Sequence, residues 1–158
     1  MTQSAPTLTP DELARYIDHT NLKPDATVTD LERLCQEAAE HHFAMVAVNS
    51  APVARCAALL NGTGVHVGAA IGFPLGQTTI AAKVFEVADA IENGADEIDY
   101  VINITELKAG NLAHVEDEMR RITDEARRGG ILSKVILETC YLTDAEKRTV
   151  CEIAREVR

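Results

Sequence analysis

The sequence lacks the features that mark several classes of protein. Lys and Arg number only 15 against 25 Asp and Glu, for a net charge of −10, which argues against a nucleic-acid partner because phosphate binding needs clustered cations. No apolar run approaches the roughly 20 residues that span a bilayer, so no membrane association is expected. The opening residues show no basic stretch followed by an apolar one, so no secretion signal is expected.

Cysteine is scarce, and its spacing is uninformative. None of the four cysteines falls in a C-x-x-C pair, so neither a zinc site nor a disulfide framework is indicated. We therefore expect a reduced protein of the cytoplasm with no bound metal. What the chain does have is 46% hydrophobic and 25% charged residues over 158 positions, the balance of a globular protein with a sizeable core.

Strand-like and helix-like segments alternate along the chain. Five strands are predicted, at 16–22, 43–49, 64–73, 94–103 and 131–139, and each is followed by a segment of helical periodicity. Capping boxes mark three helix starts, with the pairs Thr9–Glu12, Thr29–Glu32 and Thr143–Glu146. This alternation predicts an α/β fold with a parallel sheet. We expect residues 1–14 to form a tail and first helix, and residues 15–158 to form one domain.

The two faces of the predicted strands differ in polarity. Alternate residues share a face, which places Asp18 and Thr20 together, Asp99 with Asn103, and Lys134 beside them, while the opposite faces are apolar. An open sheet covered by helices on both sides is expected to be apolar on both faces. A (β/α)8 barrel instead directs one face into a central cavity. The first strand–helix turn also lacks the G-x-G-x-x-G pattern of dinucleotide-binding sheets, so the barrel is favoured.

An acid and a lysine on adjacent inward faces allow two interpretations. Asp99 and Lys134 could form a buried ion pair that only satisfies two charges. Alternatively, they could belong to a carbonyl site, in which a desolvated lysine forms an imine and a carboxylate moves protons. The residue pattern alone leaves both open.

Three stretches carry a resemblance to a known family. The segments "YIDHTNLKPDAT", "IGFPLGQTTIAAKVFEVADAIENGADEIDYVIN" and "SKVILETCYLTDAEK" closely resemble 2-deoxyribose-5-phosphate aldolases, in the right order from about Arg15 onward. The resemblance implies a TIM-barrel lyase of deoxyribose phosphate catabolism. Such an enzyme cleaves 2-deoxy-D-ribose 5-phosphate to D-glyceraldehyde 3-phosphate and acetaldehyde through a lysine imine (a Schiff base), without a cofactor.

The resemblance also implies roles for individual residues. It makes Asp99 the proton donor and acceptor, and Lys134 a supporting lysine of the fifth strand. The positions that it implies for binding the phosphorylated sugar or aldehyde are Asp18, Thr20, Asn49, Asn103 and Glu138.

Five strand–helix units are present where a barrel has eight. The resemblance places the Schiff-base lysine on a sixth strand, and no residue of this chain corresponds to it. We therefore expect an incomplete barrel that has negligible activity alone and forms a homo-oligomer or binds a complementing second chain. The alternatives are a non-catalytic half-barrel that serves as an interaction scaffold, or one piece of a split enzyme.

Overall fold

Five parallel strands form the centre of the fold in the computed structural model, which describes residues 8–157. Their order in the sheet is β1-β2-β3-β4-β5, so the chain always steps to the next position in one direction. A doubly wound sheet would reverse its order, whereas this order builds a barrel wall. The strands are β1 Asp18–Asn21, β2 Met45–Asn49, β3 His66–Ile71, β4 Glu97–Val101 and β5 Leu132–Ile136.

The five predicted strands are confirmed, although each is shorter than its apolar run. The expected tail at residues 1–7 lies outside the described part of the chain. The helical elements are α1 Pro10–Ala14, α2 Val28–His41, α3 Val53–Leu60, α4 Ile80–Glu92, α5 Ile104–Lys108, α6 Leu112–Arg128, the short 3-10 helix η1 Thr139–Tyr141 and α7 Asp144–Glu156.

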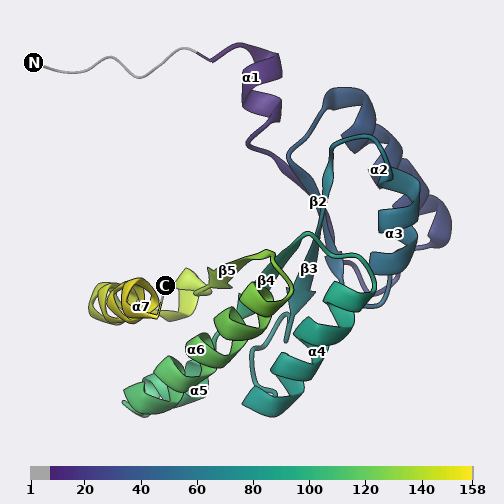
Figure 1. Cartoon of the computed structure of the whole chain (residues 1–158). Coiled ribbons are helices and arrows are strands. Elements are labelled where there is room, and N and C mark those ends of the chain that lie inside the picture. The colour runs from purple at the N-terminus through teal and green to yellow at the C-terminus, as the bar shows by residue number, and fades with distance from the viewer. Residues whose placement is uncertain (1–7, 158) are drawn as a thin grey trace, which may run out of the picture.

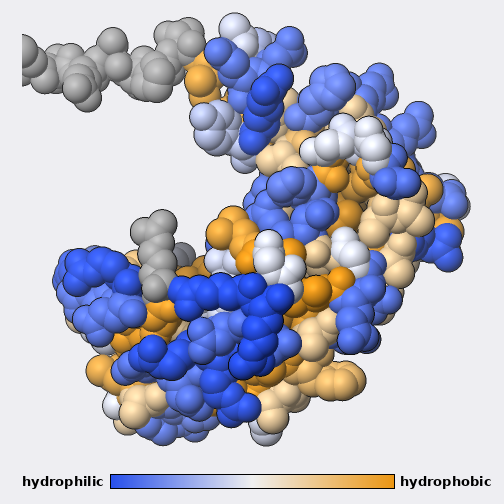
Figure 2. Space-filling view, in the orientation of Figure 1, coloured by the Kyte–Doolittle hydropathy of each residue, from blue (hydrophilic) through white to orange (hydrophobic). Residues whose placement is uncertain are grey.

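The helices cover one face of the curved sheet. Figure 1 shows α2, α3, α4 and α6 along its convex side, with α1 and α7 at the two ends of the arc. In the same orientation, the space-filling view of Figure 2 is hollowed on the opposite side. The edges β1 and β5 do not pair with each other, so the described residues form an incomplete barrel of five strand–helix units, as predicted.

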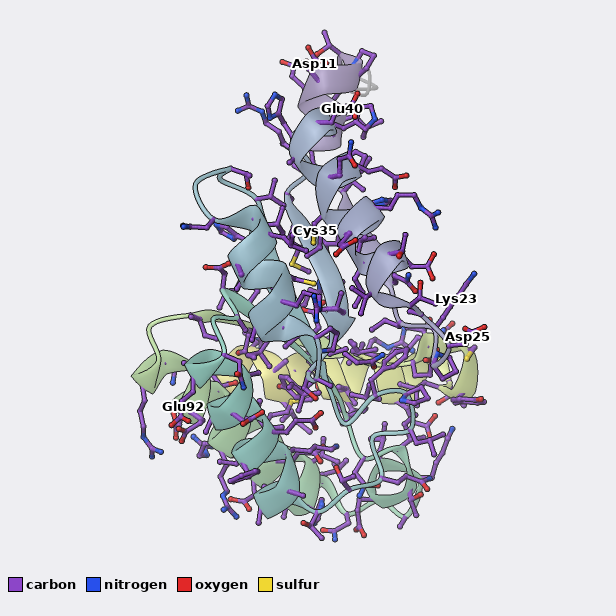
Figure 3. All side chains as sticks on the ribbon, turned by 90° about the vertical axis from the view of Figure 1, so that its right-hand side faces the viewer. Asp11, Lys23, Asp25, Cys35, Glu40 and Glu92 are labelled. Atoms are coloured by element: carbon purple, nitrogen blue, oxygen red, sulfur yellow. The ribbon has the colours of Figure 1, made fainter. Side chains whose placement is uncertain are left out.

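The apolar face of each central strand supplies the core. Val46 and Val48 of β2 and Ile98 of β4 are fully buried, and burying such a side chain contributes about 1.5–3 kcal/mol. Between the outer helices the core includes Cys35, which Figure 3 shows inside the molecule while the labelled Glu40 and Glu92 lie outside. The predicted division between an apolar convex face and a polar concave face is confirmed.

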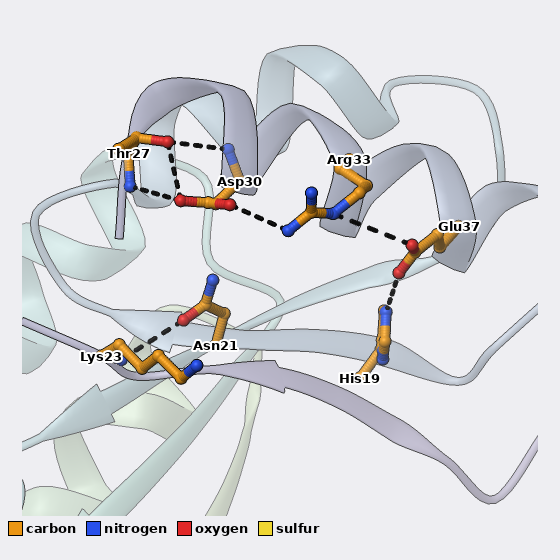
Figure 4. A network of polar contacts seen from close by, with 7 residues as sticks. All are labelled: His19, Asn21, Lys23, Thr27, Asp30, Arg33 and Glu37. Atoms are coloured by element: carbon orange, nitrogen blue, oxygen red, sulfur yellow. Dashed lines mark hydrogen bonds and ion pairs between the residues drawn. The ribbon is translucent and has the colours of Figure 1, made fainter. Parts of the chain in front are cut away.

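One predicted helix start is wrong. The capping boxes of Thr9 and Thr143 form as predicted, but α2 is capped by Thr27 and Asp30 rather than by Thr29 and Glu32. The Asp30 carboxylate accepts hydrogen bonds from the Thr27 backbone N–H at 3.0 Å and from its hydroxyl at 2.7 Å (Figure 4). The aspartate two residues earlier reaches the cap as well as a glutamate would, and the helix gains two residues.

His19 lies on the convex side, as its alternation on β1 predicts. Its Nε2 is 2.8 Å from the Glu37 carboxylate of α2 (Figure 4), and its ring lies against Phe43. It therefore packs the first strand against a helix and does not face the concave side. In addition, no helix among residues 8–157 has the length and apolar character needed to cross a bilayer.

The cap of α7 predicts a pH-dependent stability. Lys108 of α5 and the Thr143 backbone and hydroxyl donate to the Glu146 carboxylate, which lowers its pKa to about 2 from the ordinary 4.5. A depressed folded-state pKa contributes stability that is present above the unfolded value and is lost as the pH falls through the folded one. The Glu146→Gln variant should therefore be less stable than the parent at pH 6.5, with a difference that shrinks from pH 4.5 toward pH 2.

Thermal unfolding followed by circular dichroism across this range measures the effect. Glu152→Gln, an exposed position of the same helix, is the matched control and should show no such trend. A destabilisation by Glu146→Gln that is the same at every pH would contradict the assignment.

Candidate active site

One register row of the sheet carries most of the predicted polar site. Parallel pairing aligns Asn49 with Ala70, Ala70 with Asp99, and Asp99 with Lys134. Residues in one row of adjacent strands point to the same side of a sheet, so these side chains share the concave face. The small side chain of Ala70 leaves space beside Asp99.

Asp18 lies on β1, at the opposite edge of the sheet from Lys134. Its side chain reaches Lys134 because the rows of paired residues shift along the strands from β1 to β5. In an eight-stranded barrel with a shear of eight, a row slips by about one residue per strand, or about four over the steps from β1 to β5. Asn21 pairs with Val48, so the row of Lys134 meets the first strand one residue later, at Leu22. Asp18 precedes Leu22 by four residues, which brings it level with Lys134.

The Lys134 ammonium lies between two carboxylates. Its Nζ is 2.8 Å from Asp99 Oδ2 and 3.0 Å from Asp18 Oδ2. The side chain of Asp99 is 11% exposed, whereas those of Asp18 and Lys134 are 40% and 48% exposed. The predicted acid–lysine pair is therefore confirmed as a contact. Asp99 lies against the sheet, and the other two groups face the open side.

The two oxygens of Asp99 have different surroundings. Oδ2 contacts the Lys134 ammonium, while Oδ1 is buried and has no hydrogen-bond partner among residues 8–157. A buried, unpartnered carboxylate oxygen is costly, and protonation of the carboxyl lowers that cost. One carboxylate oxygen is thus held in an ion pair, and the other is buried without a partner among these residues.

Burial and charge act on both members of the pair. Burial raises the pKa of Asp99 above its ordinary value, and the negative charges of Asp18 and Glu97 add to this, while Lys134 opposes it. Burial lowers the pKa of Lys134, but its hydrogen bonds to Asp99 and Asp18 and their charges outweigh burial, so that the pKa is raised. Lys134 is thus held as a cation, and the carboxylic acid form of Asp99 is made more accessible.

The other predicted binding residues are less closely joined to this centre. The Thr20 hydroxyl donates to the Asp18 carbonyl oxygen at 2.7 Å, and the Asn49 amide donates to the Leu22 carbonyl oxygen at 3.5 Å. Asn103 caps α5, because its side-chain oxygen accepts the Glu106 N–H at 3.3 Å. Their roles in binding stay predictions.

Glu138 follows β5 in a left-handed conformation with φ of 51°. It lies at the rim of the sheet, in a cavity of about 520 Å³ at the carboxyl ends of β3, β4 and β5. The other residues that line the cavity are Pro74, Leu75, Gln77, Ile104, Lys108 and Tyr141. Ligand sites of barrels lie at this end, so the cavity is suitably placed for an entering ligand.

A second ion pair was missed by sequence reasoning. The run "EDEMRR" at 116–121 reads as a solvated helix face, yet Glu118 is fully buried and pairs with the fully buried Lys83 of α4 at 2.6 Å. The helical spacing could have indicated that Glu118 is buried, because Glu118 lies on one helical stripe with the buried Val115, Met119 and Ile122. A glutamate on an apolar stripe requires a cation, and α4 carries one.

Among residues 8–157, no cluster of three His, Cys, Asp or Glu side chains is arranged to hold a metal ion.

Comparisons with known proteins agree on the family. The family described as "DeoC/LacD family aldolase" matches residues 13–155. A deoxyribose-phosphate aldolase of Bacteroides thetaiotaomicron is 54% identical over 149 residues, which are 94% of this chain and 63% of the relative. One of Lactobacillus acidophilus is 51% identical over 148 residues, or 94% of this chain and 62% of the relative. The chain thus spans about three fifths of the length of these relatives.

Solved structures agree with the fold. A crystal structure of a proposed deoxyribose-phosphate aldolase from Coccidioides immitis superposes with a TM-score of 0.92 at 35% identity, covering 97% of this chain and 60% of the other. A tetrameric deoxyribose phosphate aldolase from Aeropyrum pernix superposes with a TM-score of 0.86 at 30% identity, covering 94% and 62%. The chain belongs to the DeoC/LacD aldolase family.

Proposed function

We propose that this chain supplies the acid–base part of a deoxyribose-phosphate aldolase active site. The observation that carries the proposal is the Asp99 carboxylate, which is held by Lys134 at one oxygen and is buried and unpartnered at the other. The reaction is the cleavage of 2-deoxy-D-ribose 5-phosphate to D-glyceraldehyde 3-phosphate and acetaldehyde. We expect it to occur in the cytoplasm and without a metal or other cofactor.

Asp99 suits proton transfer for a geometric and an electrostatic reason. Lys134 contacts Oδ2 and so holds the carboxyl group in one orientation. Burial raises the pKa of the carboxyl, which brings its proton equilibrium closer to the working pH, as a general acid–base group needs. In the cleavage direction a base removes the hydroxyl proton as the carbon–carbon bond breaks, and the same group later returns a proton to the carbon of the two-carbon product.

Lys134 does not suit the role of imine-forming amine. A nucleophilic lysine needs a lowered pKa so that its neutral form is available, whereas two carboxylates raise the pKa of Lys134. Lys83 is buried among backbone oxygens behind the sheet. The proposal therefore assigns Schiff-base formation, which makes the reaction class I, to a lysine outside the described residues, on a sixth strand.

The open edges favour association as well. The strands β1 and β5 end the sheet without a neighbour on their outer sides, and unpaired strand edges recruit further strands. We propose that the chain self-associates or binds a complementing second chain. The second candidate function, a non-catalytic half-barrel scaffold, rests on the same edges.

The isolated 158-residue chain should show no measurable cleavage of deoxyribose 5-phosphate. Borohydride reduction in the presence of acetaldehyde should leave Lys134 unmodified, because its ammonium is held by Asp18 and Asp99. Light scattering should give a mass above that of one chain. Mass spectrometry locates any adduct, and an active monomer, or an ethyl adduct on Lys134, would contradict this division of roles.

Asp99→Asn should remove activity in a chain that has the missing units. The 158 residues are fused to the part of the Bacteroides relative that the match does not cover, and retro-aldol cleavage is measured. We expect kcat to fall by about 10² to 10⁴ in the variant, since an amide cannot exchange the proton. Glu92→Gln, at an exposed position of α4, is the control and should stay within about threefold. A folded but inactive fusion would instead favour the scaffold.

Lys134→Met should raise the pKa of Asp99 further. The ammonium opposes the effect of burial on this carboxyl, so its removal leaves burial and the charges of Asp18 and Glu97 unopposed. NMR titration of the Asp99 carboxyl carbon measures the midpoint. Lys147→Met, which removes an exposed lysine paired with Asp144, should leave that midpoint unchanged. A lower midpoint in Lys134→Met would contradict the described electrostatics.

A further inference from the structure

In the buried ion pair of Lys83 and Glu118, every charged atom has a hydrogen-bond partner. The Lys83 ammonium donates to three acceptors, the carbonyl oxygens of Gly76 at 2.7 Å and Val101 at 2.6 Å and the Glu118 carboxylate at 2.6 Å. These match the three protons that an ammonium carries. The second oxygen of Glu118 accepts the backbone N–H of Asn103 at 2.8 Å. Each charge is thus compensated and hydrogen-bonded.

The backbone groups that the pair binds belong to the rim of the candidate site. Val101 is the last residue of β4, two positions after Asp99, and Asn103 follows at the start of α5. Gly76 lies in the loop that leaves β3. The pair therefore joins the exit of the strand that carries Asp99 to the neighbouring loop, from behind the sheet.

The loop that leaves β3 packs closely against Lys83 and the end of β4. Gly72 and Gly76 have φ of 61° and 65°. A Cβ at Gly72 would lie 2.9 Å from Lys83 Cε, and one at Gly76 would lie 2.1 Å from the Ile102 carbonyl oxygen. Only glycine leaves space for the lysine stem and the strand exit to approach the loop in this way.

A second acid of α4 extends the same arrangement. Glu86, one turn after Lys83, accepts the Gly72 N–H at 2.9 Å and the Ser50 hydroxyl at 2.8 Å. Ser50 directly follows Asn49 at the end of β2. Through Lys83 and Glu86, one face of α4 thus holds the segments that follow β2, β3 and β4.

Stability alone is a weak reason to place a lysine here. A buried ion pair recovers little more than its desolvation cost, and well-packed apolar side chains of similar volume are often as stable. What an apolar pair cannot do is bind Gly76, Val101 and Asn103 at fixed distances. The contacts are therefore better explained by the geometry that they impose.

From these contacts we propose that Lys83 and Glu118 are positioning residues for the aldolase reaction, which fix the end of β4 so that Asp99 stays aligned with Lys134. This inference rests on the proposed function, because it assumes that Asp99 is the group that must be aligned. Neither residue contacts the concave side. Their effect is exerted through the strand, and small displacements of a reacting group reduce rates by up to about 10².

The test replaces the pair with apolar side chains, as Lys83→Met with Glu118→Leu, in the 158-residue chain. Two NMR measurements report on the end of β4, namely hydrogen exchange of the Asn103 amide and titration of the Asp99 carboxyl carbon. We expect exchange to accelerate by about tenfold or more, because the amide loses a charged acceptor. The Asp99 midpoint should shift downward, because a loosened strand admits water to the carboxyl.

The matched control is Arg120→Met with Glu116→Leu, which removes an exposed pair of the same helix α6. Neither measurement should change in it. If the buried double variant fails to fold, Glu118→Gln, which keeps the volume but removes the charge, should move both quantities in the same directions. A folded variant in which Asn103 exchange and the Asp99 midpoint equal those of the parent would overturn the inference.

Activity of the fused protein separates this inference from the proposed function. The buried double variant should lower kcat by about tenfold to a hundredfold. If Asp99→Asn leaves kcat unchanged, Asp99 is not the acid–base group and the proposed function fails. If Asp99→Asn abolishes activity while the double variant leaves kcat unchanged, the positioning role alone fails.

Discussion

The buried carboxylate of Asp99 is the constraint on which the candidate site depends. An ionised carboxylate in the wall of a sheet is unfavourable by several kcal/mol unless a cation lies against it. Lys134 supplies that cation because parallel register aligns it with Asp99. The slope of the rows then brings Asp18 of the first strand to the other side of the ammonium. Strand order, register and shear together place three charges in contact, although 116 residues separate Asp18 from Lys134.

The ion pairs Lys83–Glu118 and Asp99–Lys134 differ in how completely their charged atoms are hydrogen-bonded. Lys83 and Glu118 are fully buried, and each of their charged groups is satisfied on every side. Asp99 and Lys134 lie at an open face, and one oxygen of Asp99 is left without a partner. A fully satisfied pair resists change and suits a fixed frame. A partly satisfied pair leaves one oxygen whose cost of burial depends on its protonation, which suits the proposed acid–base role. Lys83 and Glu118 lie behind the end of β4, the strand that carries Asp99.

Local patterns predicted the fold better than they predicted the network behind it. Alternation within each strand was enough to separate an apolar convex face from a polar concave face, and to direct Asp99 and Lys134 to the same side. The start of α2 was missed, because Thr27–Asp30 and Thr29–Glu32 are both plausible caps and only the path of the loop decides between them.

The Lys83–Glu118 pair was missed for a different reason. Its members are 35 positions apart on two helices, and nothing in either segment specifies how those helices face each other. The side chain of Asn103 has a local role that the sequence analysis did not foresee, because it caps α5; its role in binding stays a prediction. In the sequence, the Lys83–Glu118 ion pair was indicated by charged residues on otherwise apolar helical stripes. Such a residue indicates that an oppositely charged partner is present, but not which residue it is.

The electrostatics of Lys134 constrain where an imine could form. An amine that attacks a carbonyl must spend part of its time neutral, and an ammonium held by two carboxylates does not meet that requirement. The nucleophile of the proposed reaction therefore has to be a different amine. Lys134 can then keep its charge throughout the reaction. A permanent cation at this position stabilises the carboxylate form of Asp99, so in the proposed reaction the ion pair that makes the burial of Asp99 tolerable also favours release of the proton that Asp99 has accepted.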